Sequence, residues 1–173
     1  ADRGIAVAFS YEAKRRGVRR GMTNREIKKI CPEAIILPGD YEAYCLFSKR
    51  LFAILRRFTG AVEEYSIDEG FIDITGLDKV EGLSYRQIAE TIKNTIQREL
   101  GITVSIGLAP TKVLAKLASG ANKPNGLVVI STKDLPEYLR DFLVDQVWGI
   151  GSSTAEYMRR LNIFTAYDFV GQS

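Results

Sequence analysis

Apolar residues along the chain follow two patterns, longer stretches with helical spacing and shorter extended runs. Residues 84–100 place an isoleucine or leucine on one face at almost every turn, and Gly101 follows where a glycine commonly ends a helix. Residues 41–58 show the same periodicity and are followed by Gly60. The expected apolar face of that segment comprises Tyr44, Phe47, Leu51, Ile54, Leu55 and Phe58.

The remaining segments are shorter and are separated by glycine and proline. We expect strands at residues 5–9, 34–37, 102–108 and 127–130, and an extended stretch over residues 62–74 that is interrupted at 66–70. Further helices are predicted at residues 23–30, 110–118 and 134–143, followed by a helix, a glycine turn and a helix within residues 147–170.

After residue 40 the predicted order is helix, strand, strand, helix, strand, helix, strand. This order indicates an α/β protein of the α+β type, a ferredoxin-like βαββαβ sandwich that lacks its first strand and has one extra helix. Residues 1–40 predict a small separate unit that precedes it.

The composition restricts the possible chemistry. Hydrophobic residues make up 46% of the 173 positions, and no apolar run approaches the roughly 20 residues needed to cross a bilayer. We therefore expect a cytoplasmic protein without a membrane partner. The chain has no histidine, and its two cysteines lack the spacing of metal ligands, which argues against a zinc site and against serine–histidine or cysteine–histidine catalysis.

Charge is distributed unevenly although the net charge is only +3. Residues 13–20 (AKRRGVRR) contain five cations, a density that favours a polyanionic partner, whereas isolated basic pairs are usually solvated helix faces.

The segment Tyr65–Asp73 (YSIDEGFID) contains the adjacent carboxylates Asp68 and Glu69. In a straight strand they would point to opposite faces, so a shared metal site requires a bend, which Gly70 permits. Hard divalent cations prefer such oxygen ligands. The alternative from spacing alone is a solvent-facing acidic hairpin tip.

Four segments, taken in chain order, resemble motifs of the Y-family (translesion) DNA polymerases and together extend over nearly the whole chain. They are SYEAK with a following GV (residues 10–18), SIDE with FID (66–73), NKPNG (122–126) preceded by TKVLAK (111–116), and VWGIG with TAE (147–156).

The resemblance implies roles for individual residues. Asp68 and Glu69 match two of the three carboxylates that bind Mg²⁺, two ions in the complete enzyme. Tyr11, Lys14 and Lys123 match positions that hold the incoming nucleotide (dNTP). The family commonly has arginine at the position of Lys14, so a bidentate grip on phosphate is lost here. Outside the motif, these three residues would be ordinary surface side chains.

The resemblance also implies that the segment after residue 147 is a helix-hairpin-helix of the thumb. Gly149, Gly151 and Ser152 would present free helix amides to a phosphate of primer–template DNA, and Arg159 would contact the same backbone. The alternative is a glycine-containing turn between helices with no ligand.

The resemblance divides the chain into fingers (1–40), palm (41–131) and partial thumb (132–173). The family's first aspartate-bearing strand should precede residue 1, so we expect an incomplete catalytic core of a template-directed polymerase acting in damage bypass. A sliding clamp would bind through a region absent here. The alternatives are a non-catalytic, polymerase-like DNA-binding accessory protein, or a ferredoxin-like RNA-binding domain, for which paired exposed aromatic residues are lacking.

Overall fold

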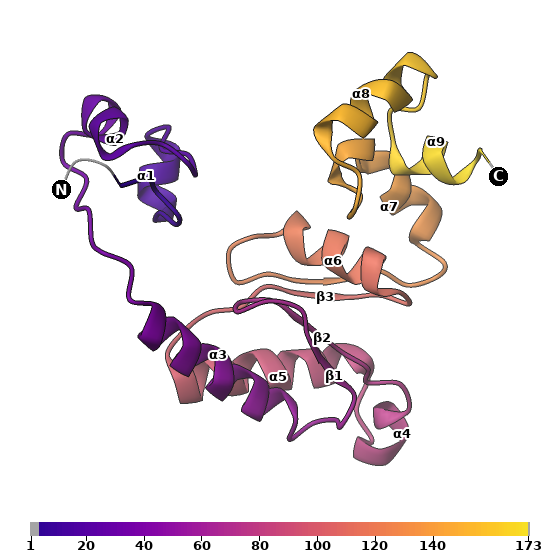
Figure 1. Ribbon diagram of the computed structural model, residues 1–173. Coiled ribbons are helices and arrows are strands. Elements are labelled where there is room, and N and C mark those ends of the chain that lie inside the picture. The colour runs from indigo at the N-terminus through magenta and orange to yellow at the C-terminus, as the bar shows by residue number, and fades with distance from the viewer. Residues whose placement is uncertain (1–3, 173) are drawn as a thin grey trace. The chain divides into compact units, whose positions relative to one another are not determined.

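The computed structural model describes residues 4–172, and contacts divide the chain into two compact units, Ala1–Tyr41 and Glu42–Ser173 (Figure 1). Each unit is described by itself. The boundary lies at the start of a long helix, and the three-part division into fingers, palm and thumb stays a prediction.

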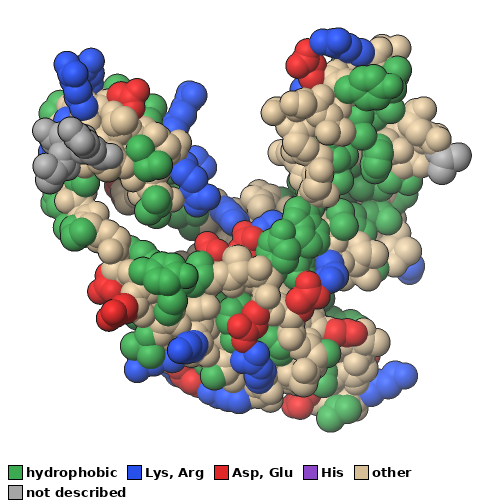
Figure 2. Space-filling model, in the orientation of Figure 1, with side chains coloured by type: hydrophobic (Ala, Val, Ile, Leu, Met, Phe, Trp, Pro, Cys, Tyr) green, Lys and Arg blue, Asp and Glu red, His purple; other side chains and the backbone are tan. Residues whose placement is uncertain are grey.

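In the described part of the first unit the chain forms two short helices, α1 (Tyr11–Arg15) and α2 (Asn24–Ile30). A capping box begins α2, because the Thr23 side chain accepts from the Glu26 amide and the Glu26 carboxylate accepts from the Thr23 amide. A small core holds the unit together, formed by Val18, Ile27 and Cys31, each 5% exposed or less. Several Lys and Arg side chains project from its surface (Figure 2).

Two predicted strands of this unit were wrong. Within residues 5–9 the pairing is limited to one antiparallel bridge between Ile5 and Thr23 and to backbone hydrogen bonds of Ala6, and residues 34–37 form no strand. A short apolar run suits a strand, but a strand also needs a neighbour along its length. Among the described residues the pairing of the first segment ends at Ala6, and the second segment has no such pairing.

The second unit is organised around two helices, α3 (Tyr41–Leu55) and α5 (Tyr85–Leu100), which lie beside each other beneath the strands (Figure 1). The expected isoleucine face of α5 is confirmed, since Ile88, Ile92 and Ile96 are each 2% exposed. On α3, Phe52 is the most buried side chain although it was not on the expected face, and Tyr44 is exposed. Gly101 has φ 68° and ends α5 as predicted.

Within residues 4–172 the strands form two separate two-stranded sheets. Strand β1 (Val62–Glu64) pairs antiparallel with β2 (Gly70–Ile72), and β3 (Ile106–Leu108) pairs parallel with β4 (Leu127–Val129). Both sheets contribute apolar side chains to the same core as α3 and α5. The α+β class is therefore confirmed, with a divided sheet and strands shorter than expected.

The remaining helices complete the second unit. The helix α4 (Leu77–Glu81) was not predicted, whereas α6 (Lys112–Ala121) connects the parallel strands as expected. Beyond β4 follow α7 (Leu135–Asp141), the short 3₁₀ helix η1 (Val144–Gln146), α8 (Ser152–Arg160) and α9 (Ala166–Val170). Among the described residues, no helix has the length and apolar character needed to cross a membrane.

Candidate metal-binding turn and nucleic-acid interface

The two adjacent carboxylates lie in a tight turn at the tip of the β1–β2 hairpin. The amides of Tyr65 and Ser66 both donate to the Glu69 carbonyl oxygen, at 3.0 and 2.9 Å, and this closes the loop over Asp68. The Ser66 hydroxyl donates to Asp68 Oδ1 at 2.9 Å. The bend that a shared metal site requires is present, and it leaves the Asp68 side chain exposed at the tip.

Glu69 has a partner that the sequence did not indicate. Lys116 of α6 forms an ion pair with the Glu69 carboxylate, and both side chains are partly withdrawn from solvent, at 29% and 38% exposure. Lys116 belongs to the TKVLAK segment that carries the resemblance, but its spacing along the sequence gave no sign of this contact. The turn therefore combines one open carboxylate with one that a lysine neutralises.

Asp73, the third acid of the same motif, is hydrogen-bonded to the backbone. Its Oδ1 accepts from the Thr75 amide at 2.8 Å, in the bend that follows β2. Hydrogen bonds from the Thr75 side chain and amide lower the pKa of Asp73 below its usual range. This carboxylate is thus committed to the local backbone.

The predicted nucleotide-binding residues lie in both units. Tyr11 and Lys14 are exposed on the same short helix α1, one turn apart, and Ser10 caps that helix through the Ala13 amide at 3.2 Å. Lys123 is exposed in the turn between α6 and β4. The structure thus places Asp68 and Glu69 in the same turn, and Tyr11 and Lys14 on the same helix.

The predicted hairpin segment has the backbone of a sharp turn into a helix. Gly149 has φ 95°, a conformation that favours glycine, and α8 begins at Ser152 after Gly151. No side chain caps this helix start, so its first amides are available to an acceptor. Arg159 is paired with Asp145 at 2.5 Å, which the sequence did not indicate.

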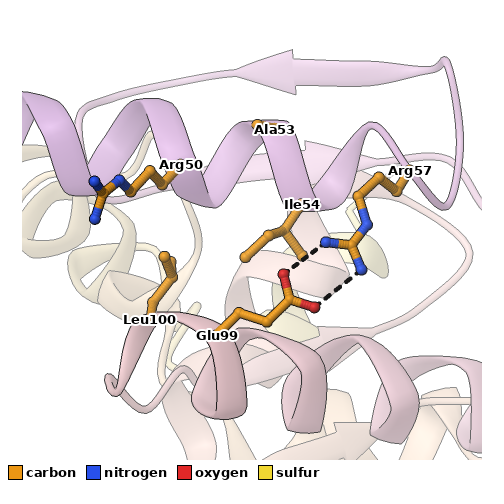
Figure 3. A pocket seen from close by; sticks show the side chains of 6 residues that line it. All are labelled: Arg50, Ala53, Ile54, Arg57, Glu99 and Leu100. Atoms are coloured by element: carbon orange, nitrogen blue, oxygen red, sulfur yellow. Dashed lines mark hydrogen bonds and ion pairs between the residues drawn. The ribbon is translucent and has the colours of Figure 1, made fainter.

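A shallow cavity of about 330 Å³ lies between α3 and α5 (Figure 3). Two of its charged residues are paired with each other, because the Arg57 guanidinium donates to both Glu99 oxygens, at 2.6 and 3.0 Å. This pairing lowers the pKa of Glu99 and raises that of Arg57. The arrangement braces two helices, and none of the predicted site residues lines it.

Comparisons with known proteins show which family this chain belongs to. The family model described as impB/mucB/samB matches residues 1–120, which include the acidic turn, α1 and Lys116. The chain belongs to the impB/mucB/samB family. DNA polymerase IV of Bacillus velezensis is 42% identical over 166 residues, which cover 96% of this chain and 40% of that protein. DNA polymerase IV of Moorella thermoacetica is 39% identical over 169 residues, covering 97% of this chain and 42% of its own length.

Solved structures agree with this assignment. A Dbh ternary complex superposes with a TM-score of 0.88 at 35% identity, covering 98% of this chain and 51% of that one. DinB from Sulfolobus solfataricus gives a TM-score of 0.83 at 35% identity, with 95% and 48% covered. A Y-family DNA polymerase chimera of Dbh and Dpo4 gives 0.90 at 34%, with 99% and 50% covered. The resemblance to the Y-family is confirmed, and the chain spans about half the length of these structures or less.

Proposed function

We propose that this chain forms the fingers, most of the palm and part of the thumb of a template-directed DNA polymerase of the translesion type. The complete enzyme would add deoxynucleotides to a primer 3′ end during bypass or repair of damaged DNA. The observation that carries the proposal is the exposed turn with Asp68 and Glu69 at a hairpin tip, in a chain similar to proteins named DNA polymerase IV.

The acidic turn fits part of a magnesium site. Asp68 and Glu69 supply the hard oxygen ligands that Mg²⁺ prefers. Within residues 4–172 no group of three acidic, histidine or cysteine side chains is arranged to hold a metal ion, so further ligands would come from substrate, water or other residues of the protein. When bound, Mg²⁺ would activate the primer 3′-hydroxyl and offset the charge that develops on the phosphates.

The proposed reaction is a phosphoryl transfer. The primer 3′-hydroxyl loses its proton to solvent water and its oxygen forms a bond to the α-phosphorus, while the bond from that phosphorus to the bridging oxygen breaks and pyrophosphate leaves. Tyr11 would donate a directional hydrogen bond to the triphosphate, and Lys14 and Lys123 would act as point charges. All three side chains are exposed and able to meet a ligand.

DNA would be held by its backbone. The uncapped amides at Gly151 and Ser152, after the turn at Gly149, would receive a phosphate. Arg159 would add a charge there after exchanging its contact with Asp145. Such contacts position a duplex without reading its sequence, as a polymerase requires. A sliding clamp would be bound through sequence outside this chain.

The test is Mg²⁺-dependent extension of a primer by one nucleotide, measured for the product of the whole reading frame and for its Asp68→Ala variant. We expect at least about a hundredfold loss, because even the partners of metal ligands are worth roughly 10–100-fold. Asp141→Ala, at the exposed end of α7, is the matched control and should extend normally. Circular dichroism checks that each variant is folded.

One observation favours the second candidate, a non-catalytic DNA-binding accessory protein: Lys116 already neutralises Glu69. An accessory protein would bind primer–template DNA and extend nothing, with or without Asp68. Extension that survives Asp68→Ala would instead refute the role given to this carboxylate.

A further inference from the structure

The acidic turn is flanked by two aromatic residues that meet a third from a distant part of the chain. Tyr65 precedes the turn, Phe71 follows it on β2, and their ring centroids are 6.1 Å apart. Trp148 lies against both, with its centroid 5.0 Å from Tyr65 at an interplanar angle of 87° and 5.5 Å from Phe71 at 31°. All three separations lie in the range of favourable ring contacts.

This aromatic cluster of Tyr65, Phe71 and Trp148 is also braced from α6. The Lys112 ammonium lies 5.7 Å from the Phe71 ring centroid and is 2.8 Å from Glu63 Oε2 on β1. One turn further along α6, Lys116 holds Glu69. The hairpin that carries Asp68 is therefore fixed by α6 at its strands and by Trp148 at both ends of its turn.

Trp148 sits at the start of the proposed DNA contact. It immediately precedes Gly149, whose φ of 95° sets the direction of the loop, and four residues after Trp148 the uncapped helix α8 begins at Ser152. A phosphate held by those amides would fix this loop and, with it, the indole ring. The same residue thus touches the frame of the acidic turn and belongs to the segment that would hold DNA.

We propose that Trp148 is a positioning residue, which couples the seating of DNA at the start of α8 to the geometry of Asp68 and Glu69 through Tyr65 and Phe71. This inference rests on the proposed function and deepens it. It assigns the indole no contact with reacting atoms. Its effect is to hold the two carboxylates where a divalent ion and the primer end would meet.

The chain provides its own reporter, because Trp148 is the one tryptophan among its 173 residues. Titration with Ca²⁺ should change the Trp148 emission, since ligation by Asp68 and Glu69 would shift the rings beside them. The change should vanish in Asp68→Asn. It should persist in Tyr138→Leu, which removes a comparable ring contact, that of Tyr138 with Phe142, away from the turn.

Binding of Mn²⁺, followed by electron paramagnetic resonance in the same samples, tests the metal site separately from the coupling through Trp148. If Mn²⁺ binds in an Asp68-dependent way while the emission stays constant under Ca²⁺, the coupling is refuted and the metal site stands. If no Asp68-dependent binding occurs, the metal site proposed above fails and the inference falls with it.

Kinetics of the whole reading-frame product supply the functional readout. Trp148→Ala should lower kcat roughly tenfold, the effect of losing two ring contacts, with little change in KM for the nucleotide. Trp148→Phe should restore most of the loss, and Tyr138→Leu should keep wild-type rates. Equal losses in the Ala and Phe variants, or a change confined to KM, would overturn the proposal.

Discussion

Replacing Gly107 by alanine tests how closely α6 must approach β3 to hold its lysines beside the acidic turn. A Cβ at this position would lie 2.0 Å from the Ala115 carbonyl oxygen, 2.4 Å from the Ser119 amide nitrogen and 2.9 Å from the Ala118 Cβ. Two of these three are helix backbone, which no rotamer change can move. Ala118 is fully buried, so the helix would have to withdraw from the strand by more than an ångström.

The expected cost follows from that displacement. Overpacking a well-packed core costs about 1–3 kcal/mol, and the reduced freedom of the unfolded chain returns roughly 0.4–1 kcal/mol. Gly107→Ala should therefore destabilise the protein by about 1–2 kcal/mol or more. Gly120→Ala, in α6 and with nothing within 4 Å of its added Cβ, should stabilise the protein by about 0.5–1 kcal/mol.

Urea unfolding followed by circular dichroism measures both variants against the wild type. The midpoints should move in opposite directions at an unchanged slope. A Gly107→Ala protein as stable as the wild type would refute the close contact between α6 and β3. Equal destabilisation of both variants would show that the helix cannot accept alanine for reasons other than packing.

Three further predictions concern charged groups. Hydrogen bonds from the Thr165 amide lower the pKa of Asp168, so its contribution to stability is present above the unfolded pKa of about 3.9 and is lost as the pH falls through the folded value. Thermal melts should thus show Asp168→Ala less stable than wild type at pH 7 and equal to it in strong acid. A difference in melting temperature that does not change with pH would contradict this. A double-mutant cycle on Arg57 and Glu99 should give a small favourable coupling that weakens as salt is raised, since both side chains are partly exposed to solvent. Lys116→Met should tighten Mn²⁺ binding at the acidic turn, which electron paramagnetic resonance would detect; weaker binding would show that the lysine prepares the site instead of competing for it.

The sequence predicted those parts of the fold that depend on local periodicity. The isoleucines of α5 recur at helical spacing, and the glycine after it adopts the expected left-handed conformation. Prediction failed where a partner decides the structure. The apolar run at residues 5–9 resembles a strand, yet its pairing ends at Ala6. On α3, Phe52 is buried by the core beneath it, which helical spacing alone did not single out.

In the candidate site, too, the sequence indicated the residues that are adjacent along the chain and not those brought in by packing. Asp68 and Glu69 were singled out because their motif is contiguous. The bend that a shared site requires is present at residues 66–68, whereas Gly70 begins β2, where a Cβ would lie 2.4 Å from the Phe52 ring. Lys116 and Trp148 lie far from the turn in sequence and reach it only through the packing of α6 and of the loop before α8. Both stood inside segments that carried the resemblance, so the motif marked them as significant without indicating what they touch.

These two contacts act on the turn in different ways. The ion pair with Lys116 stabilises Glu69 in the absence of a metal, and a divalent ion must compete with it for the carboxylate. The ring of Trp148 is uncharged and has no such competition, so its contact can persist when a metal binds. A metal would then release the lysine while the aromatic cluster keeps the hairpin in place. Because the freed ammonium would remain close to the turn, it would be available to a phosphate that arrives with the metal, as an incoming nucleotide does. The two variants should therefore differ in kind: loss of Lys116 changes metal affinity, whereas loss of Trp148 changes the rate at which bound substrates react.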